Sequence, residues 1–191
     1  LSATIAEHGE YIASEDVDAI AVNFAANAPE FKPLRPKYYI LADPHFFANT
    51  DDVNVARLIK HIQEVDWDMT LFLPFSARKG NNLKATNYLQ IEFYNAVGIE
   101  GFAWLQKCAF DQRRGMPRPR NVLIPAIMTG IGMGYRDIYI AGADHTWTAT
   151  LHVDEENHVC SHQPHFYKED DKEVKRIRTE YLKYPLHSIL Y

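Results

Sequence analysis

The sequence has few cysteines, no long apolar run and no excess of positive charge. Cys108 and Cys160 are the only cysteines among 191 residues, so no disulfide framework is predicted and the chain suits a reducing compartment such as the cytoplasm. No apolar stretch reaches the roughly 20 residues of a membrane-spanning helix, although peripheral association with a membrane stays open. The net charge of −5 argues against a protein held on nucleic acid by phosphate contacts.

The length and composition are those of an ordinary globular chain. Hydrophobic residues make up 47% and charged residues 24% of the sequence, which is enough to build a core without disulfide or metal support. The chain starts at Leu1 rather than Met and ends in an apolar stretch at residues 189–191. We expect the natural protein to extend beyond both ends.

Short apolar runs recur along the chain, and each ends in small or polar residues. Runs of this kind with little alternation are typical of strands covered on both faces, as in a parallel sheet. The predicted strands are residues 19–22, 38–42, 70–73, 89–94 and 138–141.

Helical spacing occurs between several of these runs. Residues 52–65 place apolar side chains on one stripe and begin with acidic residues, as expected for a helix N-terminus. Residues 122–133 form a second predicted helix with Asn121 as its cap; its glycines indicate a close helix–sheet contact or an end at Gly132 or Gly134. The alternation predicts an α/β fold of Rossmann-like type, an open and mostly parallel sheet with helices on both faces.

A polar, histidine-rich stretch follows the last predicted strand. We interpret residues 148–172 as a long loop or lid. The chain therefore divides into a nucleotide-binding type of domain, residues 1–147, and a lid-like appendage, residues 148–191.

Polar clusters follow three of the predicted strands. They are Asn23, the group Asp43, Pro44 and His45, and residues 142–145, which include Gly142, Asp144 and His145. Ligands of open α/β sheets bind outside the carboxyl ends of the strands. Asn and Asp also end strands because they form good turns, but three such clusters together favour a binding site.

An arginine-rich loop precedes the second predicted helix. Residues 113–120 hold four arginines and two prolines, which no regular element accommodates. Arg118 or Arg120, above the helix N-terminus, would suit an anionic group such as phosphate. The alternative is a solvated basic turn.

Histidines gather near the end of the chain. Five of the nine lie within residues 145–165, and each could act as a general base because the free imidazole pKa lies near 6.5. His158, Cys160 and His162 alternate and would share one face of a strand, so zinc is a possible ligand. The usual paired zinc motif is absent, and metal is the weaker interpretation; surface histidines are the plain alternative.

The order of these motifs resembles two related groups of proteins. One is the family 42 bacterial sialyltransferases. The other is a set of bacterial proteins from surface-polysaccharide gene clusters that are related to archaeal hydroxymethylpterin diphosphokinases. The resemblance rests on residues 21–23, on residues 39–47 with their Asp-Pro-His-Phe-Phe ending, and most specifically on residues 133–145.

The resemblance implies the roles of several residues. Asn23, Asp43 and Pro44 would line the nucleotide pocket, and the loop from Gly142 to Asp144 would face the donor phosphate and sugar. His165, near Tyr167, matches the region that supplies the catalytic base, and His145 is a second candidate. This chain has His145 and Trp147 where the family has a tyrosine, and it does not include the family's Gly-rich nucleotide loop.

The leading hypothesis is a bacterial glycosyltransferase of surface-polysaccharide synthesis. It would transfer a nucleotide-activated sugar, in the family a cytidine monophosphate sugar, to a saccharide acceptor by direct displacement and without a metal. One alternative is pyrophosphate transfer from ATP to a pterin, which would need magnesium held by Asp43 and Asp144. The other is a non-catalytic binding domain on the same fold.

Overall fold

The computed structural model describes residues 2–14, 16–48 and 51–143, and three short strands farther along the chain. Its contacts separate two compact units. The first is Ala3–Tyr139, and the second joins Leu1–Ser2 to Ile140–Tyr191. The predicted division at residue 147 stays a prediction.

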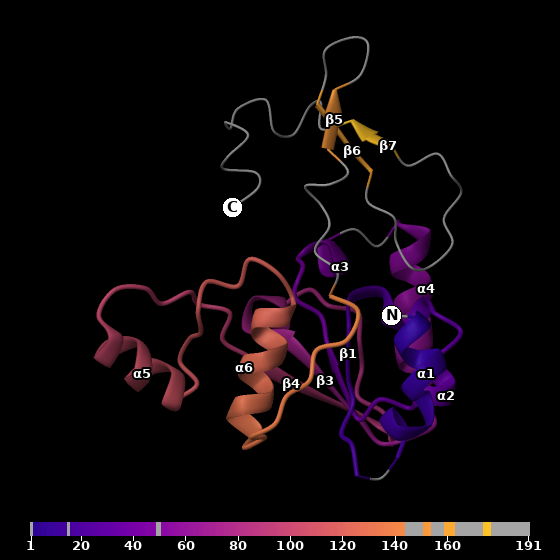
Figure 1. Ribbon diagram of the computed structural model, residues 1–191, viewed down its shortest axis with the longest axis horizontal. Helices are drawn as coiled ribbons and strands as arrows, with labels where there is room; N and C mark the ends of the chain where they lie inside the picture. The colour runs from indigo at the N-terminus through magenta and orange to yellow at the C-terminus, as the bar shows by residue number, and fades with distance from the viewer. Residues whose placement is uncertain are drawn as a thin grey trace. The chain divides into compact units, whose positions relative to one another are not determined.

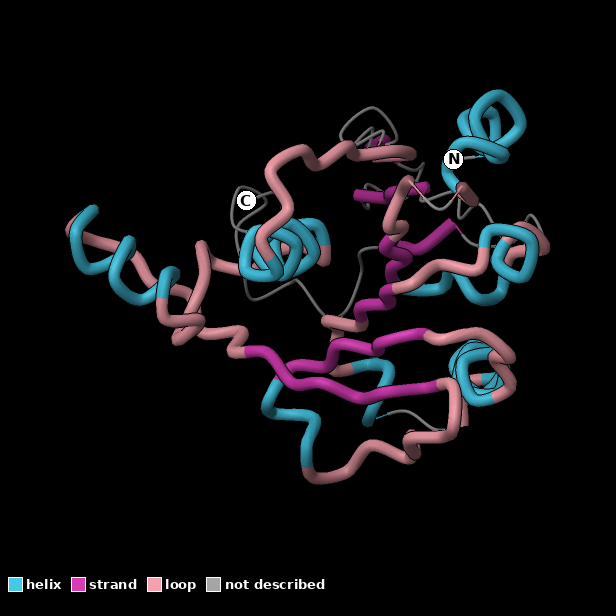
Figure 2. Tube along the Cα trace, turned by 90° about the horizontal axis from the view of Figure 1, so that it is seen from below, coloured by secondary structure: helices cyan, strands magenta, loops and turns pink. Residues whose placement is uncertain are grey.

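A four-stranded parallel sheet is the centre of the first unit. Its strands lie in the order β1-β2-β3-β4, and every neighbouring pair is parallel (Figure 2). They are β1 (Ile20–Val22), β2 (Tyr38–Ile40), β3 (Met69–Pro74) and β4 (Leu89–Tyr94). Four of the predicted strands are therefore confirmed, and so is the Rossmann-like α/β class.

Helical segments alternate with these strands. They are α1 (Ser2–Ile12), η1 (Asn23–Asn27), α2 (Phe31–Leu34), α3 (His45–Ala48), α4 (Val53–Gln63), η2 (Phe75–Arg78), α5 (Ala103–Asp111) and α6 (Leu123–Met133). In Figure 1, α2 and α4 lie on one side of the sheet and α6 lies on the other.

The core lies between α4 and the sheet. The apolar stripe predicted for this helix is buried, since Leu58 and Ile62 are fully inaccessible and pack in one cluster with Leu71, Leu73 and Tyr39. Removing this apolar surface from water is the main stabilising contribution to the fold. The cluster holds α4 against β2 and β3, and it therefore sets the position of the N-terminus of α4 relative to the sheet.

A polar contact holds the end of α6 against the opposite face. The Tyr135 hydroxyl donates to Asp18, and the Tyr38 hydroxyl lies 3.1 Å from that of Tyr135. Lys37 Nζ pairs with the same Asp18 carboxylate at 2.8 Å. These residues precede or begin β1 and β2, so α6 runs from the carboxyl ends of the strands back to their amino ends.

The predicted strand at residues 138–141 is wrong, because the structure has no strand there. Gly134 ends α6 in the left-handed conformation, with its N–H bonded to the carbonyls of Gly130 and Ile131. Ile138 then folds back on α6, where a Cβ at Gly130 would lie only 3.2 Å from its Cδ1. Ile138 is thus used in a helix contact, whereas Tyr139 and Ile140 are 91% and 53% exposed.

The second unit contains a small antiparallel sheet. Its strands are β5 (Leu151–Val153), β6 (Val159–His162) and β7 (Val174–Arg176), in the order β5-β6-β7. The interpretation of residues 148–172 as one long loop is therefore wrong where β5 and β6 form. Both strands contain valine, which favours extended backbone.

No helix in the described part of the chain is long and apolar enough to cross a membrane.

Substituting Gly134 should destabilise the protein, because its φ of 97° is strained for a residue with a Cβ. We expect Gly134→Ala to lower the free energy of unfolding by about 1 kcal/mol. Gly9→Ala, the same change inside α1 where φ is negative, should raise it by up to about 1 kcal/mol. Urea unfolding of both variants measures the difference, and equal effects would contradict this account of the helix end.

Candidate active site

The candidate site lies where the parallel strands of the first unit end. All four carboxyl ends meet at one edge of the sheet, here called the carboxyl edge. The segments that follow β1, β2 and β3 there are η1, residues 43–45 and η2. Asn23 and Asp43 follow adjacent strands, so the structure brings these two predicted residues to the same edge.

A buried tyrosine fixes the segment after β1. The Tyr39 hydroxyl donates to the Asn23 carbonyl at 2.6 Å and accepts the Ala26 N–H at 2.9 Å. Burial raises the pKa of Tyr39 far above its usual value, although the Ala26 N–H works against the rise. The hydroxyl is therefore neutral and can donate. It stabilises Asn23 in the left-handed region, at φ 50°, a conformation that Asn tolerates better than most residues.

The turn after β2 is built by Asp43. Its Oδ1 accepts the His45 N–H at 2.8 Å, and its carbonyl accepts the Phe46 N–H at 3.2 Å. Pro44 lies in the same turn, where its fixed φ and missing N–H cost nothing. Asp43 and Pro44 thus form a turn, as the alternative interpretation of this cluster held, and the turn presents the next residue, His45, at the carboxyl edge.

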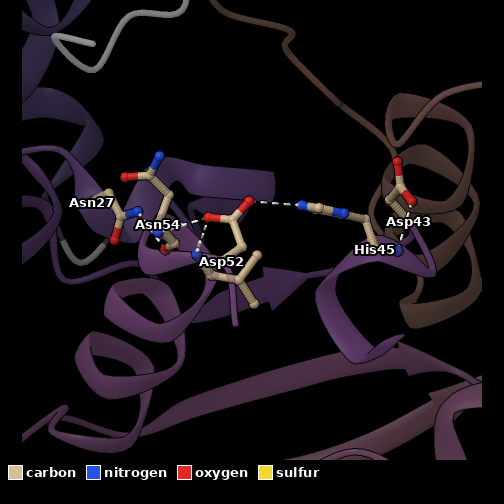
Figure 3. Close-up of polar contacts among 6 residues, drawn as sticks. Asn27, Asp43, His45, Asp52 and Asn54 are labelled. Carbon is tan, nitrogen blue, oxygen red and sulfur yellow. Dashed lines mark hydrogen bonds and ion pairs between the residues drawn. The ribbon is translucent and has the colours of Figure 1, made fainter. Parts of the chain in front are cut away.

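His45 and Asp52 form the central polar pair of the site. His45 Nε2 lies 3.1 Å from Asp52 Oδ2, and the two side chains are 41% and 30% exposed (Figure 3). The other oxygen of Asp52 accepts the N–H groups of Asn54, at 2.8 Å, and Val55, at 3.3 Å. One carboxylate therefore caps α4 and orients the imidazole.

The ionisation of Asp52 follows from these contacts. Partial burial acts to raise the pKa of Asp52, but the N–H groups of Asn54 and Val55, and then His45, outweigh it and hold the pKa below its usual value. An ionised carboxylate only accepts hydrogen bonds. Nε2 of His45 must therefore carry the proton, and in the neutral ring Nδ1 is the acceptor. An imidazole oriented in this way is suited to act as a general base.

The half-buried amide of Asn27 lies at the start of α4. Asn27 Nδ2 donates to the Asn54 carbonyl at 3.0 Å (Figure 3), whereas Asn27 Oδ1 is buried and has no partner in the described structure. His61 Nδ1 donates to the Ala26 carbonyl at 2.7 Å and helps to hold η1 on α4. An orphaned buried acceptor requires a donor, which a bound molecule or a water would supply.

Cationic groups follow β3. Phe75, Ser76, Arg78 and Lys79 line a hollow of about 420 Å³. The Arg78 guanidinium lies 5.5 Å from the centre of the Phe75 ring, and neither Arg78 nor Lys79 forms an ion pair in the part of the chain that the structure describes. Two cations without an ion pair among the described residues, a hydroxyl and a half-exposed aromatic ring are groups that bind phosphates and stack on bases.

The predicted arginines lie in the loop before α6. Arg118 pairs with Glu100 at 2.8 Å and is engaged in that contact, whereas Arg120 is exposed and has no ion pair among the described residues. Asn121 caps the helix as predicted, because its Oδ1 accepts the N–H groups of Leu123 and Ile124. Of the two arginines, Arg120 keeps its charge available for an anion.

The remaining predicted site residues belong to the second unit. Gly142 adopts a positive φ of 70°, while Asp144, His145, His165 and Tyr167 lie outside the described residues. His158 also lies outside them, and Cys160 and His162 both lie on β6. Their predicted roles stay predictions. Among the residues that are described, no group of His, Cys, Asp or Glu has the geometry of a metal site.

The pairing of His45 with Asp52 is the main feature that sequence reasoning missed. The sequence places His45 in a cluster after a predicted strand and Asp52 at the start of a predicted helix. Their separation of only seven residues is the one feature of the sequence that could have suggested the contact. For Arg78, the only feature of the sequence that could have suggested a binding role is its position shortly after a predicted strand.

Comparison with the known protein families, the curated proteins and the solved structures found no match. The resemblance to sialyltransferases and to pterin diphosphokinases therefore stays a prediction, and the function is argued from the geometry of the carboxyl edge.

Tyr39→Phe should destabilise the protein by about 1–3 kcal/mol, because it leaves the buried Ala26 N–H without its acceptor. Tyr88→Phe removes a hydroxyl from a side chain that is 48% exposed and should have almost no effect. Chemical denaturation measures both, and a Tyr39→Phe variant as stable as the control would show that this hydroxyl does not hold η1.

Asp52→Ala should cost about 1 kcal/mol of unfolding free energy through loss of the cap, and Asp52→Asn, which keeps a capping oxygen, should cost less. Because the folded-state pKa of Asp52 lies below the usual 3.8 of an aspartate side chain, its charge stabilises the fold above that pH. This contribution is lost as the pH falls through the lower, folded-state pKa. Wild type and Asp52→Asn should therefore converge in acid, and a constant difference down to pH 2 would refute the assignment.

Proposed function

We propose that this chain is a glycosyltransferase-like enzyme that uses a nucleotide-activated sugar as donor. The observation that carries the proposal is the His45–Asp52 pair, an oriented and solvent-accessible imidazole at the carboxyl edge of a parallel sheet. Ligand sites of open α/β sheets lie at this edge. The resemblance to family 42 sialyltransferases supports the same class of reaction, with a cytidine monophosphate sugar as the implied donor.

The reaction is a direct displacement at the sugar. His45 Nδ1 takes the proton of an acceptor hydroxyl, the resulting oxygen bonds to the anomeric carbon, and the bond from that carbon to the donor phosphate breaks. The leaving nucleotide keeps the electron pair. Asp52 stabilises the imidazolium that forms, since its carboxylate already faces Nε2. The predicted bases His165 and His145 remain alternatives to His45.

The cations after β3 suit the leaving group. Arg78 and Lys79 would neutralise the charge that develops on the phosphate, and Phe75 would stack on the base. Arg120 and the N-terminus of α6 offer a second place for negative charge, as the sequence predicts. The orphaned acceptor Asn27 Oδ1 would receive a hydroxyl or amino group of donor or acceptor.

Calorimetric titration of the full chain with nucleotides tests the donor class. We expect cytidine monophosphate or another nucleoside phosphate to bind without added magnesium, and Arg78→Gln to weaken binding about tenfold, the loss of one charged hydrogen bond. Arg57→Gln changes an exposed arginine on α4 and serves as the control. An ATP signal that requires magnesium would favour pyrophosphate transfer, and no nucleotide binding at all would remove the proposal.

Release of the nucleotide from a bound sugar donor tests the base. His45→Gln should lower turnover by about 10²- to 10⁴-fold, the usual contribution of a general base, with nucleotide affinity unchanged. His8→Gln, on exposed α1, should keep the wild-type rate. If His45→Gln turns over as fast as the wild type, the base lies elsewhere and His165 or His145 becomes the leading candidate.

A further inference from the structure

Exposed apolar side chains gather around α5. Val97, Phe102, Trp104 and Leu105, here called the α5 surface, are 56%, 74%, 69% and 42% exposed. In both Figure 1 and Figure 2, α5 stands apart from the sheet and from the other helices of the first unit. Single exposed apolar residues are common on proteins, but a group containing Trp and Phe marks an interaction surface.

The orientation of α5 explains this exposure. Ala109 is buried and Gln106 and Phe110 are half-buried, so they define the side that faces the protein. Trp104 lies on the opposite side at helical spacing, and Leu105, one turn before Ala109, lies at the border of the buried side and is 42% exposed. The helix therefore buries Ala109 and presents the indole of Trp104 to solvent, although burying a large apolar side chain would gain about 1.5–3 kcal/mol.

The charge around the α5 surface is positive. Residues 94–122 hold five basic and two acidic side chains, a local charge of +3 in a chain whose net charge is −5. Both acidic groups are neutralised, Glu100 by Arg118 at 2.8 Å and Asp111 by Lys107 at 2.6 Å. Arg114 is exposed and, like Arg120, has no ion pair within the described residues.

We propose that the α5 surface binds an anionic lipid bilayer. Trp and Phe partition into the boundary between headgroups and acyl chains, and arginines beside them attract anionic headgroups. A second copy of the chain fits this surface less well, because a symmetric contact would bring two patches of charge +3 together. Apart from Arg120, which the proposed transferase site also uses, the observations are independent of the transferase activity, which concerns the carboxyl edge.

Vesicle co-sedimentation of the full chain tests the proposal. We expect binding to phosphatidylcholine vesicles that contain phosphatidylglycerol, little binding to phosphatidylcholine alone, and weaker binding as salt rises. The double variant Phe102→Ser, Trp104→Ser should lower the partition coefficient at least about tenfold. Arg114→Gln and Arg120→Gln should each lower it about fivefold.

A matched control removes two exposed aromatics elsewhere. Tyr11 on α1 and Tyr88 just before β4 are 66% and 48% exposed, so Tyr11→Ser with Tyr88→Ser should bind vesicles like the wild type. Absence of binding to anionic vesicles, or full binding by the Phe102→Ser, Trp104→Ser variant, would overturn the proposal. A dimer in solution that this variant dissociates, without vesicle binding, would show instead that the surface joins copies of the chain.

Discussion

The Tyr39 hydroxyl is the contact on which the arrangement of the carboxyl edge depends. It connects β2 to the segment after β1 through Asn23 and Ala26, and its burial makes each of those bonds costly to lose. The fixed segment then contacts the start of α4 through Asn27 and the last turn of α4 through His61. A single buried group therefore connects two adjacent strands to α4, and it fixes the positions of Asn23 and Asn27 in η1.

Asp52 both stabilises the fold and orients the proposed general base. Its carboxylate caps α4, where the helix N-terminus favours negative charge, and also accepts from His45 Nε2. The same interaction thus contributes to stability and sets the proton on the imidazole. Losing the carboxylate would affect both, whereas changing His45 leaves the cap on Asn54 and Val55 intact. A variant of His45 therefore tests the chemistry without loss of the helix cap, whereas a variant of Asp52 changes both.

Much of the fold could be predicted because two-sided burial leaves a visible pattern. Strands β1 to β4 and the stripe of α4 were apparent as apolar runs and helical spacing. Residues 138–141 have the same apolar character, but Ile138 packs on α6 beside Gly130, and composition alone does not distinguish a helix contact from a strand. The His45–Asp52 pair was missed for a related reason, since it depends on the turn that Asp43 builds. Asn23 and Asp43 were placed correctly at one edge because parallel strands impose that placement.

The central claim is that Asp52 holds His45 with its proton on Nε2 and leaves Nδ1 free as the acceptor. Nitrogen-15 NMR of the imidazole, assigned by comparison with His45→Gln, measures this directly at a pH where the ring is neutral. The account predicts a protonated Nε2 and an unprotonated Nδ1, with the preference lost in Asp52→Asn. A ring protonated on Nδ1, or a tautomer that does not respond to Asp52→Asn, would contradict it.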